Sequence, residues 1–119
     1  MDKKKILIVD DEENIRALFG GELEDEGFEV FTAASGEEAV ELFSRVQPDL
    51  VTLDIKMPGM GGIAALVAIR DMAPTVPVII LTAFSEFKKD FDVWAADAYV
   101  QKSGDISALK TKVKFLLAS

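Results

Sequence analysis

Short apolar runs alternate with helical patterns five times along this chain of 119 residues, and this alternation constrains its fold more than any other feature. Each run has the length of a buried strand, and the patterns between runs place apolar residues three and four apart, as on one helix face. The expected strands are 5–9, 29–32, 50–54, 78–81 and 98–101. The expected helices are 13–26, 36–45, 63–72, 87–94 and 106–117.

Repeated strand–helix units imply right-handed crossovers and a parallel sheet with helices on both faces. We therefore expect an α/β fold in which residues 1–119 form one domain. The five-stranded sheet should have the order 2-1-3-4-5 of a doubly wound, flavodoxin-like three-layer sandwich. Ser35 and Glu38 form a capping box, and Gly27 is suited to end the first helix. Gly20 and Gly21 fall inside that helix, where glycine is unfavourable, and indicate either a kink or a close helix contact.

The composition excludes several kinds of chemistry. The chain has no cysteine and no histidine, so it offers no thiolate, histidine base or phosphohistidine. A net charge of −8 argues against nucleic-acid binding, which needs clustered Lys and Arg. We expect no membrane segment, because no apolar stretch approaches the ~18 residues required. The N-terminus lacks the features of a signal peptide, which favours a cytoplasmic protein.

Acidic residues follow two of the expected strands. Asp10 and Asp11 end the first strand and Asp54 ends the third. In the expected strand order these strands are neighbours that flank the switch point, where open α/β sheets place their sites. Carboxylates that close repel one another and favour a bound cation. Oxygen ligands suit Mg²⁺, or Mn²⁺ in its place.

Two further residues are expected at the same edge of the sheet as these carboxylates. Thr82 ends the fourth strand and Lys102 follows the fifth, at the same edge of the sheet. A carboxylate could attack phosphorus there while a metal ion and the lysine neutralise the oxygens of the transferring group. Each residue alone has a structural explanation, as a turn, a cap or a solvated charge. Only their joint placement favours the functional interpretation.

Four motifs, in this order, resemble the receiver domain of two-component response regulators. The motifs are Ile8-Val9-Asp10-Asp11-Glu12, Asp54-Ile55-Lys56-Met57-Pro58-Gly59-Met60-x-Gly62, Leu81-Thr82-Ala83 and Tyr99-x-x-Lys102. The resemblance covers essentially the whole chain and is closest to stand-alone, chemotaxis-regulator-like or excised receivers.

The resemblance implies a self-catalysed phosphoryl transfer, with slow autodephosphorylation, rather than an enzyme acting on other substrates. Asp54 would accept the phosphoryl group from a partner's phosphohistidine. Asp10, Asp11, Asp54 and the backbone carbonyl of Lys56 would hold Mg²⁺, and Lys102 would bind a phosphoryl oxygen. Thr82 would move to the phosphoryl group, and Tyr99 would turn inward as the coupled switch.

The chain departs from the family pattern at several positions. Lys102 precedes Ser103 where Lys-Pro with a cis bond is usual, and a cis bond before a non-proline residue costs ~2.5–4 kcal/mol. The stretch from Thr82 to Tyr99 is shorter than usual, so we expect a short helix at 87–94. Gly61 stands where Asp or Asn is common and should alter only the loop. Lys56 and Phe84 flank the path of the attacking water and should tune the lifetime of the acyl phosphate.

The expected partners are a sensor histidine kinase or a histidine phosphotransfer protein, together with a downstream protein target. The target would bind the surface of the helix at 87–94, the fifth strand and the last helix. Phe87, Phe91 and Trp94 are either core residues of that segment or an aromatic docking patch. We expect a monomer or a weak dimer.

Three alternatives compete with a phosphoryl switch. A haloacid-dehalogenase-type phosphatase also uses a strand-end Asp and Mg²⁺, but it needs Asp-x-Asp after the first strand and room for a cap domain. A flavodoxin would need a phosphate-binding loop where Asp11, Glu12 and Glu13 stand. A degenerate receiver that only binds proteins would not need the intact set of Asp10, Asp11, Asp54, Thr82 and Lys102.

Overall fold

Five strands and four helices make up the described part of the molecule. The computed structural model describes residues 3–54, 61–82, 97–101 and 106–118, and only the backbone of Thr82 and Gln101. The strands are β1 (Lys5–Val9), β2 (Glu29–Ala33), β3 (Leu50–Asp54), β4 (Val78–Thr82) and β5 (Ala98–Gln101). The helices are α1 (Glu13–Asp25), α2 (Gly36–Val46), α3 (Gly61–Met72) and α4 (Ile106–Ala118). The expected helix at 87–94 lies outside the described residues, so α4 denotes the last helix.

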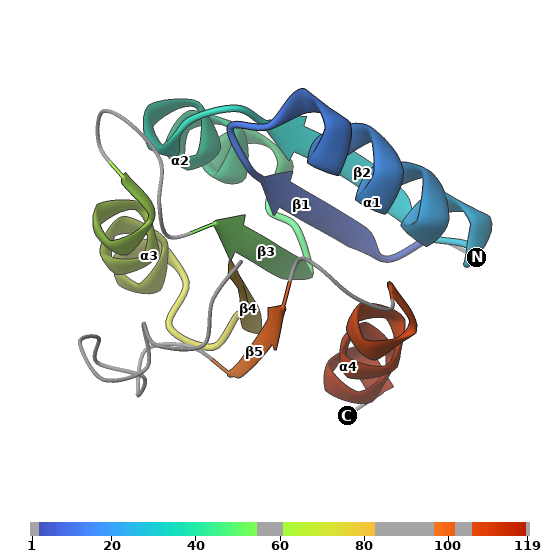
Figure 1. Cartoon of the computed structure of the whole chain (residues 1–119). Helices are drawn as coiled ribbons and strands as arrows, with labels where there is room; N and C mark the ends of the chain where they lie inside the picture. The colour runs from blue at the N-terminus through green and yellow to red at the C-terminus, as the bar shows by residue number, and fades with distance from the viewer. Residues whose placement is uncertain (1–2, 55–60, 83–96, 102–105, 119) are drawn as a thin grey trace.

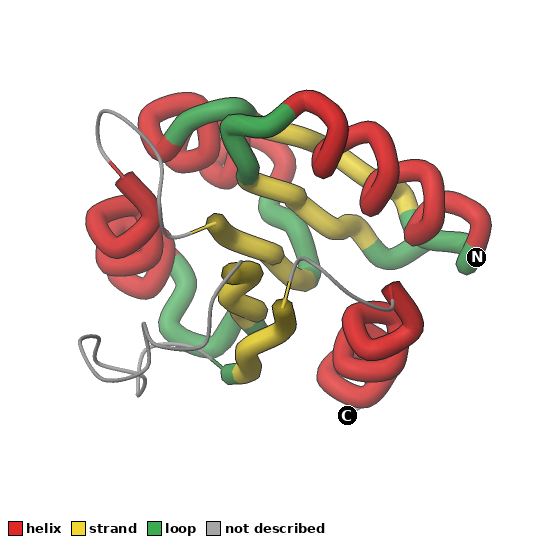
Figure 2. The backbone as a smooth tube through the Cα atoms, in the orientation of Figure 1, coloured by secondary structure: helices red, strands yellow, loops and turns green. Residues whose placement is uncertain are grey.

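The strands form one parallel sheet in the order β2-β1-β3-β4-β5, which confirms the expected topology (Figure 2). β3 lies at the centre, with Thr52 beside Ile8 of β1 and Ile79 of β4. All five residues of β3 are buried. A strand covered on both faces needs continuous apolar character, and this explains the run Leu50-Val51-Thr52-Leu53.

Helices cover both faces of the sheet, with α1 and α4 on one side and α2 and α3 on the other (Figure 1). Alternate residues of each strand point to opposite faces, so the sheet contributes to two separate cores. On one side Phe19 and Leu23 of α1 pack with Leu109 and Val113 of α4. The core on the other side includes Ala65, Leu66 and Ile69 of α3, together with buried residues of α2.

The helix ends follow the local sequence signals. Ser35 caps α2 as expected, because its hydroxyl accepts a hydrogen bond from the Glu38 backbone N–H at 3.1 Å. The Glu38 carboxylate accepts from the Ala34 N–H at 2.7 Å, one residue before the Ser35 N–H that a capping box uses, so only the Ser35 half of the expected box is confirmed. Gly27 has φ of 100° directly after α1, a left-handed conformation that glycine adopts without strain. Gly61, with φ of 80°, opens α3 earlier than the expected start at Ile63.

Gly20 and Gly21 lie within a continuous α1, and Gly20 packs closely on the sheet. A Cβ on Gly20 would lie 3.6 Å from Val30 Cγ1 and 4.0 Å from Ile8 Cδ1, whereas a Cβ on Gly21 would meet nothing within 4 Å. The structure therefore favours close packing of α1 on the sheet over a kink.

An ion pair joins α3 to the start of β5. Arg70 donates to the Asp97 carboxylate at 2.7 Å and also to the backbone carbonyl of Val76. The same Asp97 oxygen accepts the Val78 N–H at 2.8 Å. The interaction joins the starts of β4 and β5, at the edge of the sheet away from the acidic residues.

Within the described segments, no helix has the length and apolar character needed to cross a bilayer.

Candidate functional site

The turn after β1 positions two of the three acidic side chains. The Asp10 N–H donates to the Ala33 carbonyl at 3.1 Å, which extends the pairing of β1 with β2 by one residue. Asp10 Oδ1 then accepts the Glu12 N–H at 2.9 Å and shapes the turn into α1. Asp10 is fully buried, whereas Asp11 is exposed. The turn thus directs one carboxylate inward and the next to the surface.

Asp54 comes from the last residue of β3, the central strand. It lies beside Leu81 of β4 in the sheet register and is only 4% exposed. Asp10, Thr52 and Asp54 are the buried polar or charged residues of the described part. Two of these three therefore lie at the carboxyl edge of β1 and β3, the edge at which parallel α/β sheets bind ligands.

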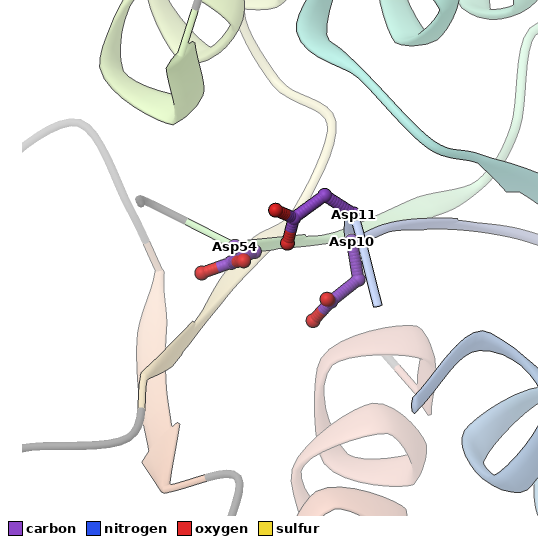
Figure 3. A group of neighbouring side chains, drawn as sticks. All are labelled: Asp10, Asp11 and Asp54. Atoms are coloured by element: carbon purple, nitrogen blue, oxygen red, sulfur yellow. The ribbon is translucent and has the colours of Figure 1, made fainter. Parts of the chain in front are cut away.

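The three carboxylates lie together, as expected from the sequence (Figure 3). One oxygen from each of Asp10, Asp11 and Asp54 lies within 4.8 Å of the others. Three negative charges at this distance, two of them shielded from water, repel strongly. A cation would relieve that repulsion.

The donor set fits a hard divalent cation. Oxygen atoms bound at roughly 2.0–2.1 Å in an octahedron lie within about 4.2 Å of one another. At most one pair of the three oxygens can lie opposite each other across the ion, and neighbouring oxygens lie about 2.9 Å apart, so the carboxylates would move closer together to share an ion. The exposed side of Asp11 leaves room for the water molecules that Mg²⁺ retains.

Arg16 is a neighbour of the site that sequence reasoning missed. Its guanidinium donates to the backbone carbonyl of Asp10 at 2.8 Å, across the turn from β1 into α1. The bond secures the turn that orients Asp10 and Asp11. The sequence signal for this contact was an arginine one turn into the helix that follows an acidic strand end. Helical periodicity alone does not specify which neighbour such a side chain contacts.

The other expected site residues divide into those that are described and those that are not. Thr82 ends β4 beside Gln101, at the same edge as Asp54. Tyr99 lies on β5, half-buried against the core formed with α2 and α3, and burial raises the pKa of its phenol above the usual 10.0. Lys56, Phe84, Lys102 and Ser103 lie outside the described residues, as do Phe87, Phe91 and Trp94.

A family model described as the response regulator receiver domain matches residues 6–114. Sporulation initiation phosphotransferase F of Bacillus subtilis is 37% identical over 116 residues, which cover 96% of this chain and 94% of that protein. The regulatory protein AtoC of Escherichia coli is 34% identical. The match covers 94% of this chain but 28% of AtoC, so the chain corresponds to a minor part of that regulator's length.

Solved structures of response regulators share the fold of this chain. The response regulator TrrA of Thermotoga maritima, in complex with Mg²⁺-BeF, is 49% identical with a TM-score of 0.90 over 95% of this chain and 98% of that chain. A second structure contains TrrA in complex with the histidine kinase ThkA, and its match has a TM-score of 0.88 with 49% identity over 96% and 98% of the two chains.

Proposed function

This chain belongs to the response regulator receiver domain family, and from that premise we propose that it is a phosphorelay switch with Asp54 as phosphoryl acceptor. The observation that carries the proposal is the gathering of the Asp10, Asp11 and Asp54 carboxylate oxygens within 4.8 Å at the carboxyl edge of the sheet. A turn or capping role for each residue would not require these three side chains to converge.

In the proposed reaction an Asp54 carboxylate oxygen attacks the phosphorus of a phosphohistidine on a partner protein. A new O–P bond forms as the N–P bond breaks, and the departing imidazole nitrogen retains the electron pair. The 119 residues contain no histidine, so the phosphohistidine that donates the group must lie outside them. The rigid central strand holds Asp54 in place, and its burial limits competition from water.

Mg²⁺, or Mn²⁺, would be held by Asp10, Asp11, Asp54 and the Lys56 carbonyl, and would neutralise charge on the carboxylates and the phosphoryl oxygens. Arg16 stabilises the turn that orients Asp10 and Asp11, through its hydrogen bond to the Asp10 carbonyl. Asp10 contributes one oxygen to that turn, through the Glu12 N–H, and its carboxylate therefore serves both the local structure and the site.

Further residues would take part in the switch. Lys102 would bind a phosphoryl oxygen, Thr82 would form a hydrogen bond with the phosphoryl group, and Tyr99 would change its packing in response. Lys56 and Phe84 would set the lifetime of the acyl phosphate. The half-buried position of Tyr99 against the core supports its part in this proposal, because a buried ring can sense a shift in β4 or β5.

We further propose that residues 1–119 act as one cytoplasmic receiver domain that takes phosphoryl groups from a histidine kinase or a phosphotransfer protein. The TrrA–ThkA complex supports a kinase partner. The reaction is a self-modification followed by slow hydrolysis, and the phosphorylated form would control a downstream protein.

Incubation with acetyl phosphate and Mg²⁺, followed by intact-mass measurement, tests the acceptor. The wild type should gain one phosphoryl group, and Asp54→Asn should gain none. Asp25→Asn is the matched control, because Asp25 is exposed near the far end of α1 and carries the same chemical change. Chelation of the metal should abolish the adduct.

Three outcomes would contradict the proposal. An adduct on neither the wild type nor Asp25→Asn would exclude a phosphoryl acceptor, and an equal adduct on Asp54→Asn would place it elsewhere. Release of many phosphates per protein would instead indicate a phosphatase. A histidine kinase domain with labelled ATP then tests the natural type of donor.

A further inference from the structure

The solvent side of α3 is apolar to an unusual degree. Nine consecutive residues, Gly61 through Ile69, have no polar side chain. A helix on the surface of a globular protein ordinarily carries charged or polar residues on its outer face. α3 buries only its inner residues, Gly62, Ala65, Leu66 and Ile69.

The outer residues of α3 form one continuous patch. Val67 is 61% exposed and Ile63 is 38% exposed, and the two lie one helical turn apart. Ala64 is also exposed, beside Ile63, and Ala68 is partly exposed beside Val67. We call Ile63, Ala64, Val67 and Ala68 the α3 patch. Small alanine side chains next to branched ones allow another helix to approach closely.

Of the two charged residues of α3 itself, Arg70 and Asp71, only Asp71 faces outward. Arg70 turns inward to Asp97 and to the carbonyl of Val76, with its side chain 18% exposed. Asp71, one turn beyond Val67, is exposed. At the other end of the helix the first turn, Gly61–Ala64, has no acidic residue to offset the positive end of the helix dipole.

We propose that the α3 patch is a self-association surface, on which α3 of a second copy of this chain packs in antiparallel orientation about a two-fold axis beside Val67. Positions four residues before and after the axis then face each other, so Asp71 of each copy meets the first turn of the other. Each carboxylate would offset the positive end of the partner's helix, whose own first turn has no acidic residue. The surface is thus self-complementary, as a two-fold interface requires.

Net charge explains why this face suits a second copy. The chain carries a net charge of −8, so two copies repel wherever their acidic surfaces meet. The α3 patch has no charged side chain and allows contact without apposing carboxylates. Since the patch is small, we expect a weak dimer with an interface below roughly 1,200 Å² in total.

Sedimentation equilibrium over a wide range of concentration tests the dimer. The wild type should move from monomer toward dimer as its concentration rises, and Val67→Glu should weaken association about tenfold or more, because it places like charges at the axis. Phe115→Glu is the matched control. Phe115 is 72% exposed on α4, which lies on the opposite face of the sheet, so that variant should associate as the wild type does.

A second test uses the absence of cysteine from the chain. Val67→Cys should form a disulfide-linked dimer on mild oxidation, since Cα atoms beside the axis fall within the roughly 4.4–6.8 Å that a disulfide spans. Phe115→Cys should cross-link far more slowly at the same concentration. Asp71→Lys should weaken the dimer, because it replaces attraction to the partner's helix end with repulsion.

Circular dichroism of each variant should show intact folding, as expected for exposed positions. A wild type that stays monomeric throughout would overturn the proposal. Equal weakening by Val67→Glu and Phe115→Glu would also contradict it, as would a dimer that Val67→Glu leaves unchanged. Equal cross-linking of the two cysteine variants would exclude the two-fold axis beside Val67.

Discussion

At the scale of single residues, the two buried polar positions of β3 have different explanations. Asp54, at the strand end, faces two other carboxylates and has a chemical role in the proposed function. Thr52, two residues earlier, is completely buried, with 0% of its surface exposed, and lies between Ile8 of β1 and Ile79 of β4. Its hydroxyl has no hydrogen-bond partner in the described part of the chain.

We predict that Thr52→Val stabilises the protein. The substitution exchanges an unsatisfied buried hydroxyl for a methyl group of similar size, and relief of that desolvation should raise the free energy of unfolding by about 1–2 kcal/mol. Denaturant titration measures the change.

The control for this prediction is Thr32→Val on β2, because Thr32 is exposed and the same exchange should change stability by less than about 0.5 kcal/mol. A loss of stability in Thr52→Val would show that the hydroxyl has a partner in solution. The acceptor reaction of Asp54 should persist in both variants.

At the scale of secondary-structure elements, α1 contains two adjacent glycines with different surroundings. Gly20 faces the sheet near Val30 and Ile8, whereas Gly21 faces open space. Neither has a positive φ, which among the described glycines belongs to Gly27 and Gly61. The helix therefore bears the entropic cost of Gly21 without a compensating contact.

Gly21→Ala should stabilise the protein by about 0.5–1 kcal/mol, because alanine restricts the unfolded chain and favours helix. Thermal unfolding followed by circular dichroism measures the effect. Gly27→Ala is the opposite case, since a Cβ at φ of 100° is strained and should destabilise by about 1 kcal/mol or more. Destabilisation by Gly21→Ala would contradict the finding that Gly21 faces open space.

At the scale of the whole molecule, ion pairs join α1 to α4, two helices from opposite ends of the chain. Lys110 lies 2.6 Å from Glu22 and 3.6 Å from Glu26, and Lys114 also pairs with Glu26. The hydrogen bond and charge of Lys114 lower the pKa of Glu26 below its usual value of 4.5. Pairing with Glu22 raises the pKa of Lys110 above 10.5.

These directions set the pH range in which the ion pairs act. A lowered carboxyl pKa stabilises the fold above pH 4.5 and loses its effect as the pH falls through the folded value. A raised lysine pKa stabilises below pH 10.5 and loses its effect as the pH rises through the folded value. The ion pairs should therefore act fully between these two limits.

Glu26→Gln should lower the melting temperature slightly at pH 7, and the difference from wild type should shrink as the pH falls below 4.5. High salt should reduce it as well, because the pairs lie at the surface. Glu24→Gln, exposed on the same helix, is the control. A difference between Glu26→Gln and wild type that persists unchanged in acid would refute the assignment to charge.

The sequence alone determined the architecture because its signals are local and consistent. Runs such as Ile6–Val9 and Val78–Leu81 mark buried strands, Ser35 and Gly27 mark helix ends, and alternation implies a parallel sheet. Topology rules then bring the ends of β1 and β3 together, so the convergence of Asp10, Asp11 and Asp54 followed without coordinates.

Only the tertiary structure decided how individual side chains are directed toward residues distant in the chain. It turned Arg16 to the Asp10 carbonyl, left the Thr52 hydroxyl without a partner in the described part, and drew Arg70 inward to Asp97. The physical reason is that periodicity specifies which face of an element is buried, whereas a hydrogen bond depends on the neighbour that packing brings within reach. The contact of Arg70 with Asp97 turns that charge inward and leaves Asp71 as the outward charge of α3, next to the α3 patch.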